Sequence, residues 1–151
     1  MKVIPFNYKH IEEILPLLSA NIPYVYPHHK YIYWILGEYF PSLCYVALNG
    51  EDIEGFVCAL HSTDKNSVFI WQLVVSAGSR GKGVAKLLCK EIMAYVCKNK
   101  VESIQLTIND KNTASIAFFT AFAHQQGYVL KEITLPFIDG FDCETAYEVE
   151  L

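Results

Sequence analysis

The sequence has no excess of basic residues and no long apolar run. Its 12 lysines and arginines stand against 16 aspartates and glutamates, which gives a formal net charge of −4. A broad cationic surface for nucleic acid is therefore not expected. No stretch reaches the roughly 18 apolar residues of a membrane-spanning helix, and the apolar segment at the N-terminus is too short for a signal peptide. We expect a soluble, cytoplasmic protein without nucleic-acid or membrane partners.

The cysteines lack the number and the spacing of a disulfide framework or a zinc site. There are five, an odd number, and most stand alone inside apolar runs. The nearest pair, Cys89 and Cys97, is too far apart for a C-x-x-C motif. We therefore expect free thiols, most of them buried as small apolar side chains, and no bound metal.

The residue patterns predict a mixed α/β fold of the α+β type. With 151 residues, 52% of them hydrophobic, the chain is long enough for one compact domain with a full core. Alternation and helical spacing predict strands at 2–6, 43–48, 54–61, 68–75, 102–108, 129–137 and 143–151, and helices at 10–18, 28–39, 84–98 and 114–125. The sheet should hold about seven strands, mostly antiparallel, flanked by about four helices with one crossover helix.

Three local features refine this prediction. Asn49-Gly50 and Asp139-Gly140 are typical of tight hairpin turns. The aromatic side chains of the helix at 28–39 favour a place in the core over a ligand site. The helix at 114–125 is apolar almost all round, so it should be heavily buried.

A glycine-rich turn joins the strand at 68–75 to the helix at 84–98, and it reads SAGSRGKG over residues 76–83. Glycines let a backbone approach a bulky ligand closely, and a helix that begins there directs its free N–H groups into the turn. Arg80 and Lys82 add positive charge. The turn therefore predicts a site for a phosphate or a diphosphate.

Two common phosphate motifs do not fit this turn. A Walker-type loop needs Ser or Thr after Gly-Lys, but Gly83 follows Lys82. A dinucleotide fingerprint needs a third glycine three residues after Gly83, where the chain has Lys86. What remains is Arg80-x-x-Gly83-x-Ala85 between a strand and a helix.

That motif resembles the acyl-CoA-binding motif of the Gcn5-related N-acetyltransferase (GNAT) superfamily, and the order of predicted elements matches its fold. The segments 55–57, 69–75, 80–85 and 107–115 are similar to the diaminobutyrate acetyltransferase branch. The resemblance covers most of the chain. It implies one N-acetyltransferase domain over residues 1–151, which transfers acetyl from acetyl-CoA to a primary amine of a small molecule, with diaminobutyrate-like amino acids as the leading class.

The resemblance also implies two sets of site residues. The set expected to bind acetyl-CoA is Leu73, Val74, Val75, Arg80, Gly81, Lys82, Gly83, Val84, Ala85, Asn112, Ser115 and Phe119. The catalytic set is Glu144, which would take a proton from the amine, Trp71, whose indole N–H would bond the substrate, and Tyr31. Simpler roles stay open: a helix cap for Asn112, a solvated hairpin carboxylate for Glu144 and plain core for Trp71.

The chain differs from this family at several residues expected to serve catalysis and to bind the acceptor amine. Phe119 stands where many GNAT enzymes have a tyrosine as general acid, so acid help would come from Tyr31, Tyr147 or water. A thiol of pKa about 8.5 leaves fairly well without such help. Tyr26 and His28 replace the branch's aspartate and asparagine, and Phe141 replaces its histidine.

These changes favour an acceptor amine that is less charged or larger than diaminobutyrate, with His28, His29 and His61 as replacement polar groups. Two other functions stay open, a non-catalytic acyl-CoA-binding protein and a peptide or protein N-acetyltransferase. The sequence does not determine the oligomeric state, and a homodimer stays open.

Overall fold

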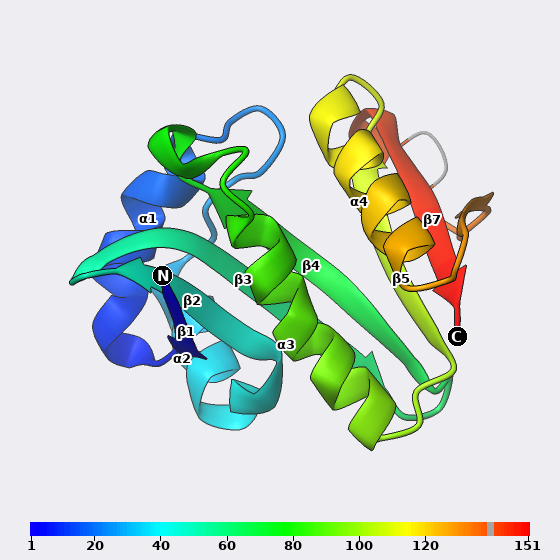
Figure 1. Cartoon of the computed structure of the whole chain (residues 1–151), viewed down its shortest axis with the longest axis horizontal. Coiled ribbons are helices and arrows are strands. Elements are labelled where there is room, and N and C mark those ends of the chain that lie inside the picture. The colour runs from blue at the N-terminus through cyan, green and yellow to red at the C-terminus, as the bar shows by residue number, and fades with distance from the viewer. Residues whose placement is uncertain (139–140) are drawn as a thin grey trace. The chain divides into compact units, whose positions relative to one another are not determined.

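The computed structural model describes residues 1–138 and 141–151 (Figure 1). In these ranges seven strands and four α-helices follow one another in the predicted order. The strands are β1 (Lys2–Pro5), β2 (Cys44–Asn49), β3 (Asp52–Ser62), β4 (Ser67–Val75), β5 (Ser103–Asn109), β6 (Leu130–Ile133) and β7 (Glu144–Glu150); the helices are α1 (Ile11–Ser19), α2 (Lys30–Tyr39), α3 (Val84–Lys98) and α4 (Thr113–Gln125). The predicted mixed α/β class is confirmed. The predicted Asp139-Gly140 turn lies outside the described residues.

The strands pair in the order β1-β2-β3-β4-β5-β7-β6. β4 and β5 are parallel, with Val68 opposite Ile104, and α3 is the crossover between them. The pairs β1–β2, β2–β3, β5–β7 and β6–β7 are antiparallel. This confirms the mainly antiparallel sheet with one crossover helix. The sequence did not predict that β7 lies between β5 and β6.

The chain forms two compact units, one of residues 1–60 and 71–99 and the other of residues 61–70 and 100–151. β4 contributes residues to both. The expectation of one domain over residues 1–151 remains a prediction.

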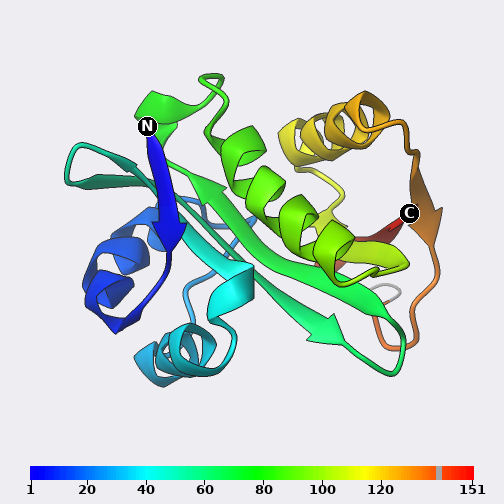
Figure 2. The ribbon, with the colours of Figure 1, turned by 60° about the horizontal axis from the view of Figure 1, so that its bottom comes forward.

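In the first unit α3 covers one face of the strands, and α1 and α2 cover the other (Figure 2). Phe6, Leu18, Tyr33 and Phe56 belong to the core beneath α1 and α2. On the face covered by α3, Gly55 leaves no room for a side chain, because a Cβ atom there would lie 2.8 Å from Val84 Cγ1. The start of α3 therefore packs directly on the backbone of β3.

The hairpin between β2 and β3 differs from its prediction by one residue. Asn49 pairs with Asp52, so the turn residues are Gly50 and Glu51, and Gly50 takes the positive φ of 65° that such a turn requires. The pairing then shifts, with Leu48 opposite Ile53 and Ala47 opposite Gly55. Glu54 is the extra residue of the resulting bulge.

The aromatic side chains of α2 do not form the core stripe that we expected. Only Tyr33 is fully buried, whereas Tyr31 is 62% exposed and Trp34 and Tyr39 are also exposed. Tyr31 stacks on Trp34 with ring centroids 5.7 Å apart. The core prediction for this helix is therefore wrong except at Tyr33.

The second unit packs α4 beside β6 and holds β5 between the first part of β4 and β7. Ile104, Leu106 and Ile108 are buried along one face of β5, as their alternation predicted. α4 buries only Phe119, Phe122 and Ala123, so the prediction of a helix buried all round is wrong.

Candidate functional site

The glycine turn leads directly into the start of α3. Gly81 and Gly83 have φ angles of 73° and 82°, and Gly83 is the N-cap residue of α3 without any side-chain cap. The first N–H groups of a helix have no acceptor within it, and the helix dipole makes this end positive. Arg80 and Lys82 are both exposed in the turn. The turn can therefore hold an anion of the size of a diphosphate.

Glu54 fixes the beginning of this turn. Its carboxylate accepts hydrogen bonds from the hydroxyl groups of Ser76 and Ser79, the second at 2.9 Å, and its carbonyl oxygen accepts the Ser76 N–H at 2.9 Å. The two hydroxyl bonds lower the pKa of Glu54. Sequence reasoning missed this contact, because no local pattern links a residue in the bulge of β3 to serines more than 20 positions later.

Arg80 ties the turn to the segment that follows α1. One of its guanidinium nitrogens, Nη2, donates to Asn21 Oδ1 at 3.0 Å, and Asn21 Nδ2 donates to the Leu17 carbonyl oxygen at 2.8 Å. The rest of the guanidinium group is exposed. It is free to meet a ligand while the Asn21 contact holds its position.

A buried polar network holds the segment before α2 against β4. The His28 N–H donates to Tyr33 Oη at 2.9 Å, Tyr33 Oη donates to Gln72 Oε1 at 3.1 Å, and Gln72 Nε2 donates to the Tyr26 carbonyl oxygen at 2.8 Å. Tyr33 and Gln72 are both buried. We call these three bonds the Tyr33–Gln72 network. It closes a ring that fixes residues 26–28 beside Trp71.

The His28 ring packs on Trp71. The ring centroids lie 4.7 Å apart, with 32° between the planes. Burial lowers the pKa of His28, so its imidazole is neutral at pH 7. Trp71 is half-buried: it packs against the core of the first unit and also contacts the His28 ring, so its catalytic role stays a prediction.

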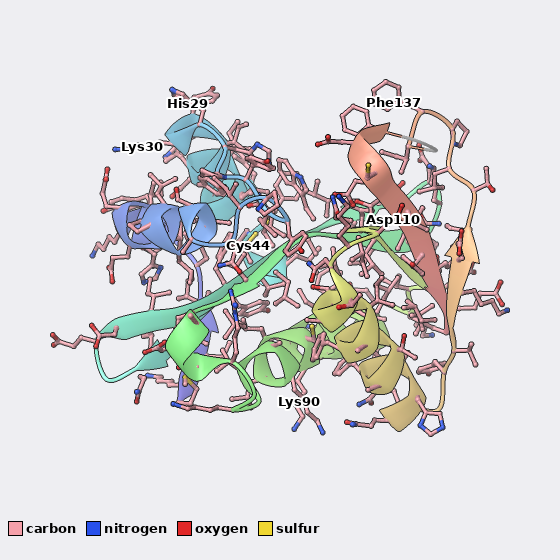
Figure 3. The ribbon with its side chains drawn as sticks, turned by 90° about the horizontal axis from the view of Figure 1, so that it is seen from above. His29, Lys30, Cys44, Lys90, Asp110 and Phe137 are labelled. Atoms are coloured by element: carbon pink, nitrogen blue, oxygen red, sulfur yellow. The ribbon has the colours of Figure 1, made fainter. Side chains whose placement is uncertain are left out.

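His29 and Tyr31 lie at the start of α2, where His29 is the N-cap residue. Figure 3 shows His29 at the N-terminal end of α2, where its Nδ1 accepts the Tyr31 N–H at 3.2 Å and caps the helix. The Tyr31 ring faces solvent against Trp34. In the first unit Trp71 thus contacts the His28 ring, whereas Tyr31 stacks on Trp34, and the catalytic role of Tyr31 stays a prediction.

In the second unit Glu144 is the first residue of β7, opposite Asn109. Its Oε2 atom is buried and has no hydrogen-bond partner among the described residues. Burial raises the pKa of Glu144, a hydrogen bond from Thr107 lowers it, and Asp142 and Asp110 raise it further. The carboxylate is therefore only partly exposed to solvent, and its catalytic role stays a prediction.

Asp110, labelled in Figure 3, directly follows β5, whose last residue Asn109 lies opposite Glu144. Its Oδ1 atom accepts the Thr145 hydroxyl, and its N–H donates to the Cys143 carbonyl oxygen at 3.0 Å. These bonds join the ends of β5 and β7 and set the backbone position of Glu144.

Asn112 is the N-cap residue of α4, and Phe119 lies within that helix. Asn112 Oδ1 accepts the Ser115 N–H at 3.2 Å, so the helix-cap role is present, and its Nδ2 makes no hydrogen bond within the described part of the chain. Phe119 is buried and contacts the Phe118 ring edge-on at 5.0 Å. The position of the general acid in many relatives is therefore purely apolar here.

No group of three or more His, Cys, Asp or Glu side chains in the described ranges is placed to hold a metal ion. Within the same ranges no helix is long and apolar enough to cross a membrane.

The chain is similar to known proteins both in sequence and in fold. L-2,4-diaminobutyric acid acetyltransferase of Halalkalibacterium halodurans is 36% identical over 110 residues, which are 72% of this chain and 54% of that protein. The enzyme of the same name from Marinococcus halophilus is 36% identical over 99 residues, which are 64% of this chain and 57% of that protein. The matched part of the chain thus spans about half the length of these relatives.

Two solved structures share the fold at lower identity. One is diaminobutyrate acetyltransferase EctA from Paenibacillus lautus, in complex with L-2,4-diaminobutyric acid and coenzyme A, with a TM-score of 0.85, 23% identity and coverage of 99% of this chain and 95% of that one. The other is Ard1 from Thermoplasma volcanium, with a TM-score of 0.76, 18% identity and coverage of 99% and 97%. The family model described as "Acetyltransferase (GNAT) family" matches residues 11–123, which include the glycine turn, β5 and most of α4, and on that match the chain belongs to the GNAT acetyltransferases.

Proposed function

We propose that this chain transfers the acetyl group of acetyl-CoA to a primary amine of a small molecule, with diaminobutyrate-like amino acids as the leading class. The observation that carries the proposal is the start of α3, where the left-handed Gly83 leaves the helix without a side-chain cap. The names of the relatives support the acceptor class, because they are diaminobutyrate acetyltransferases.

The turn fits the diphosphate of coenzyme A in shape and charge. A Cβ atom at Gly78, Gly81 or Gly83 would contact nothing within 4 Å, so the backbone on this side is open to a ligand. The positive end of the α3 dipole and the two cations of the turn complement a doubly negative group. Acetyl-CoA would supply an activated acyl group whose leaving thiol has a pKa of about 8.5.

Three groups of this chain have proposed roles in the transfer. Backbone groups of Leu73 to Val75 would pair with the pantetheine arm, and an N–H among them would stabilise the oxyanion formed when the amine attacks. The Glu144 carboxylate would bind an ammonium group through its Oε2 atom, which is buried without a hydrogen-bond partner among the described residues, because a buried charged oxygen is costly until it gains a partner. Since Phe119 cannot donate a proton, the thiol would leave as the thiolate.

Phe119 also favours a second candidate, a non-catalytic acyl-CoA-binding protein. Such a protein would keep the glycine turn and would need no acid on α4. It should bind acetyl-CoA as tightly as an enzyme would, and it should release no CoA with any amine.

The two candidates are separated by incubating the protein with acetyl-CoA and a panel of amines. The panel contains diaminobutyrate, ornithine, lysine, simple alkyl diamines and short N-terminal peptides. Free CoA and acetylated amine are followed by chromatography, since the exposed Cys97 and Cys143 would react with a thiol reagent. We expect turnover with a small-molecule amine, and Gly83→Asp should abolish both binding and turnover.

Binding of acetyl-CoA without turnover of any amine would favour the non-catalytic candidate. Turnover of peptides in preference to free amines would favour peptide N-acetylation. Failure to bind acetyl-CoA would remove the proposed function altogether.

A further inference from the structure

We propose that the His28 side chain binds the acceptor nitrogen and takes the proton that this nitrogen loses when the amide forms. The proposal rests on the proposed function and adds a residue to it. It makes His28 a catalytic residue of the first unit, whereas the sequence offered His28 only as one of three replacement polar groups for the acceptor.

The first argument is the position of Trp71 along β4. The cofactor arm would run along Leu73 to Val75 from the glycine turn. Trp71 lies two residues further from that turn, which is about 7 Å along an extended strand. It therefore lies toward the acyl end of the arm, where the acceptor must arrive. The His28 ring, 4.7 Å from the Trp71 ring, is at the same end.

The second argument is that the ring is held in place while its nitrogens remain available. The His28 backbone is fixed by the Tyr33–Gln72 network, and its ring is in contact with Trp71 and, at 6.4 Å between centroids, with Tyr33. In the part of the chain that the structure describes, neither ring nitrogen of His28 makes a hydrogen bond. A fixed imidazole without a partner is prepared to accept a hydrogen bond from a ligand.

The third argument is the absence of charge around the ring among the described residues of the first unit. α2 contributes Tyr33, whose pKa is raised by burial, and β4 contributes Trp71 and Gln72, which do not ionise. The neighbouring His29 is engaged in the cap of α2, and Lys30 pairs with Glu12. Burial is the only cause that shifts the pKa of His28, so the neutral imidazole persists at pH 7.

The proposed step balances as follows. A neutral primary amine attacks the thioester carbonyl carbon, and the new C–N bond makes the nitrogen strongly acidic. One N–H proton passes to the His28 imidazole, the C–S bond breaks, and CoA leaves as the thiolate. The imidazolium returns its proton to the thiolate through solvent, so the products are the N-acetyl amine and CoA thiol.

This arrangement also defines an acceptor class. The His28 and Trp71 rings bring aromatic and uncharged surface to the acceptor side, without an acidic side chain of the described residues to hold an ammonium group there. The site at Trp71 therefore favours amines that enter in the neutral form, and among amines of similar size those with a lower pKa should react faster.

The test compares His28→Phe and His28→Gln with His29→Asn as the matched control. His28→Phe keeps the aromatic contact with Trp71 but has no nitrogen, and His29→Asn keeps a cap residue on α2. With the best amine of the panel, we expect kcat/KM to fall by about 10² to 10⁴ in both His28 variants. The KM for acetyl-CoA and the melting temperature should stay close to the wild-type values, and the control should keep its activity.

The pH profile provides the readout that a purely structural role would not change. Wild-type kcat/KM should decline at acid pH with an ionisation below the ordinary histidine value of about 6.5, and this ionisation should be missing in His28→Phe. Added imidazole should restore part of the activity of His28→Ala. If His28→Phe keeps most of the wild-type kcat/KM with the same acid limb, the proposal is wrong.

A second measurement applies even if the wild type turns over no amine, an outcome that would remove the proposed function. The His28 ring proton resonance, assigned by its loss in His28→Phe, is titrated with pH in the presence of CoA. It is then followed at pH 9, where part of an alkyl amine is neutral, as 1,3-diaminopropane is added. We expect a pKa below about 6.5 and a clear shift of the resonance when the amine is added. No shift at saturating amine would overturn the assignment of His28 to the acceptor.

Discussion

Gly83 should be required for its backbone conformation and not for its small size. Its φ of 82° is unfavourable for other residues by about 1–2 kcal/mol, although a Cβ atom there would have open space around it. We expect Gly83→Ala to raise the KM for acetyl-CoA by about tenfold, the equivalent of about 1.4 kcal/mol. Gly78→Ala is the control, because Gly78 is in the same turn with the same open space but without a positive φ. An equal effect of both substitutions would contradict this explanation.

Glu144→Gln should lower the activity without lowering the thermal stability. Burial raises the pKa of Glu144 in the folded state. The folded protein therefore prefers the protonated carboxyl, and stability decreases as the pH rises through the folded-state pKa. At pH 7.5 the variant should melt no lower than the wild type, and the two should converge near pH 4. Its kcat/KM should nevertheless fall by about 10²-fold, the equivalent of about 2.8 kcal/mol, because the amide no longer offers a charge to the ammonium group of the acceptor. A melting temperature well below wild type at pH 7.5 would show that the ionised carboxylate stabilises the fold.

Single residues could be predicted from the sequence where the signal was local. The glycine turn is contiguous, so Gly81, Gly83 and the two cations were found directly. The Tyr33–Gln72 network joins residues that are separated by 39 and by 46 positions in the chain, and no local pattern predicts it. Tyr31 and Tyr33 differ by only two positions on α2, and only the rotation of the helix decides which of them faces β4.

At the scale of elements, the contact of α3 with β3 depends on the missing side chain of Gly55. A Cβ atom there would lie 2.8 Å from Val84 Cγ1 and 3.2 Å from the Val74 carbonyl oxygen. Gly55→Ala should therefore cost about 1–3 kcal/mol of unfolding free energy. Urea unfolding measures this change.

The compensating substitution is Val84→Ala, which removes the closest atom. The double variant should be more stable than the sum of the two single changes predicts, by at least about 0.5 kcal/mol. Strict additivity would mean that the backbone contact with Val74, and not the Val84 side chain, sets the cost.

Elements were predictable in kind and order, because periodicity is a property of each segment. Sheet order was not, because β7 joins β5 only through the long-range pairing of residues 103–109 with 144–150. Burial was also misjudged on α2 and α4. Aromatic or apolar composition shows that a helix can be buried, but the partner that covers each face comes from the tertiary fold.

For the molecule as a whole, thiol accessibility tests the burial pattern. All five cysteines are free, with Cys97 and Cys143 exposed and the other three buried. Burial raises the pKa values of Cys44 and Cys89 to about 12 and raises that of Cys58 as well. We expect an aromatic disulfide reagent to modify two thiols quickly in the native protein and five after denaturation. More than two fast thiols would contradict the described packing.

The Tyr33–Gln72 network has a consequence for motion. Residues 26–28 lie outside any helix or strand, and such segments usually exchange their amide protons quickly. The His28 N–H, however, donates to a fully buried tyrosine. Its hydrogen exchange should be slow enough to group with the core strands, and Tyr33→Phe should release it. In the wild-type protein, an acceptor would therefore meet a segment that is already ordered before binding, without the entropic cost of ordering it.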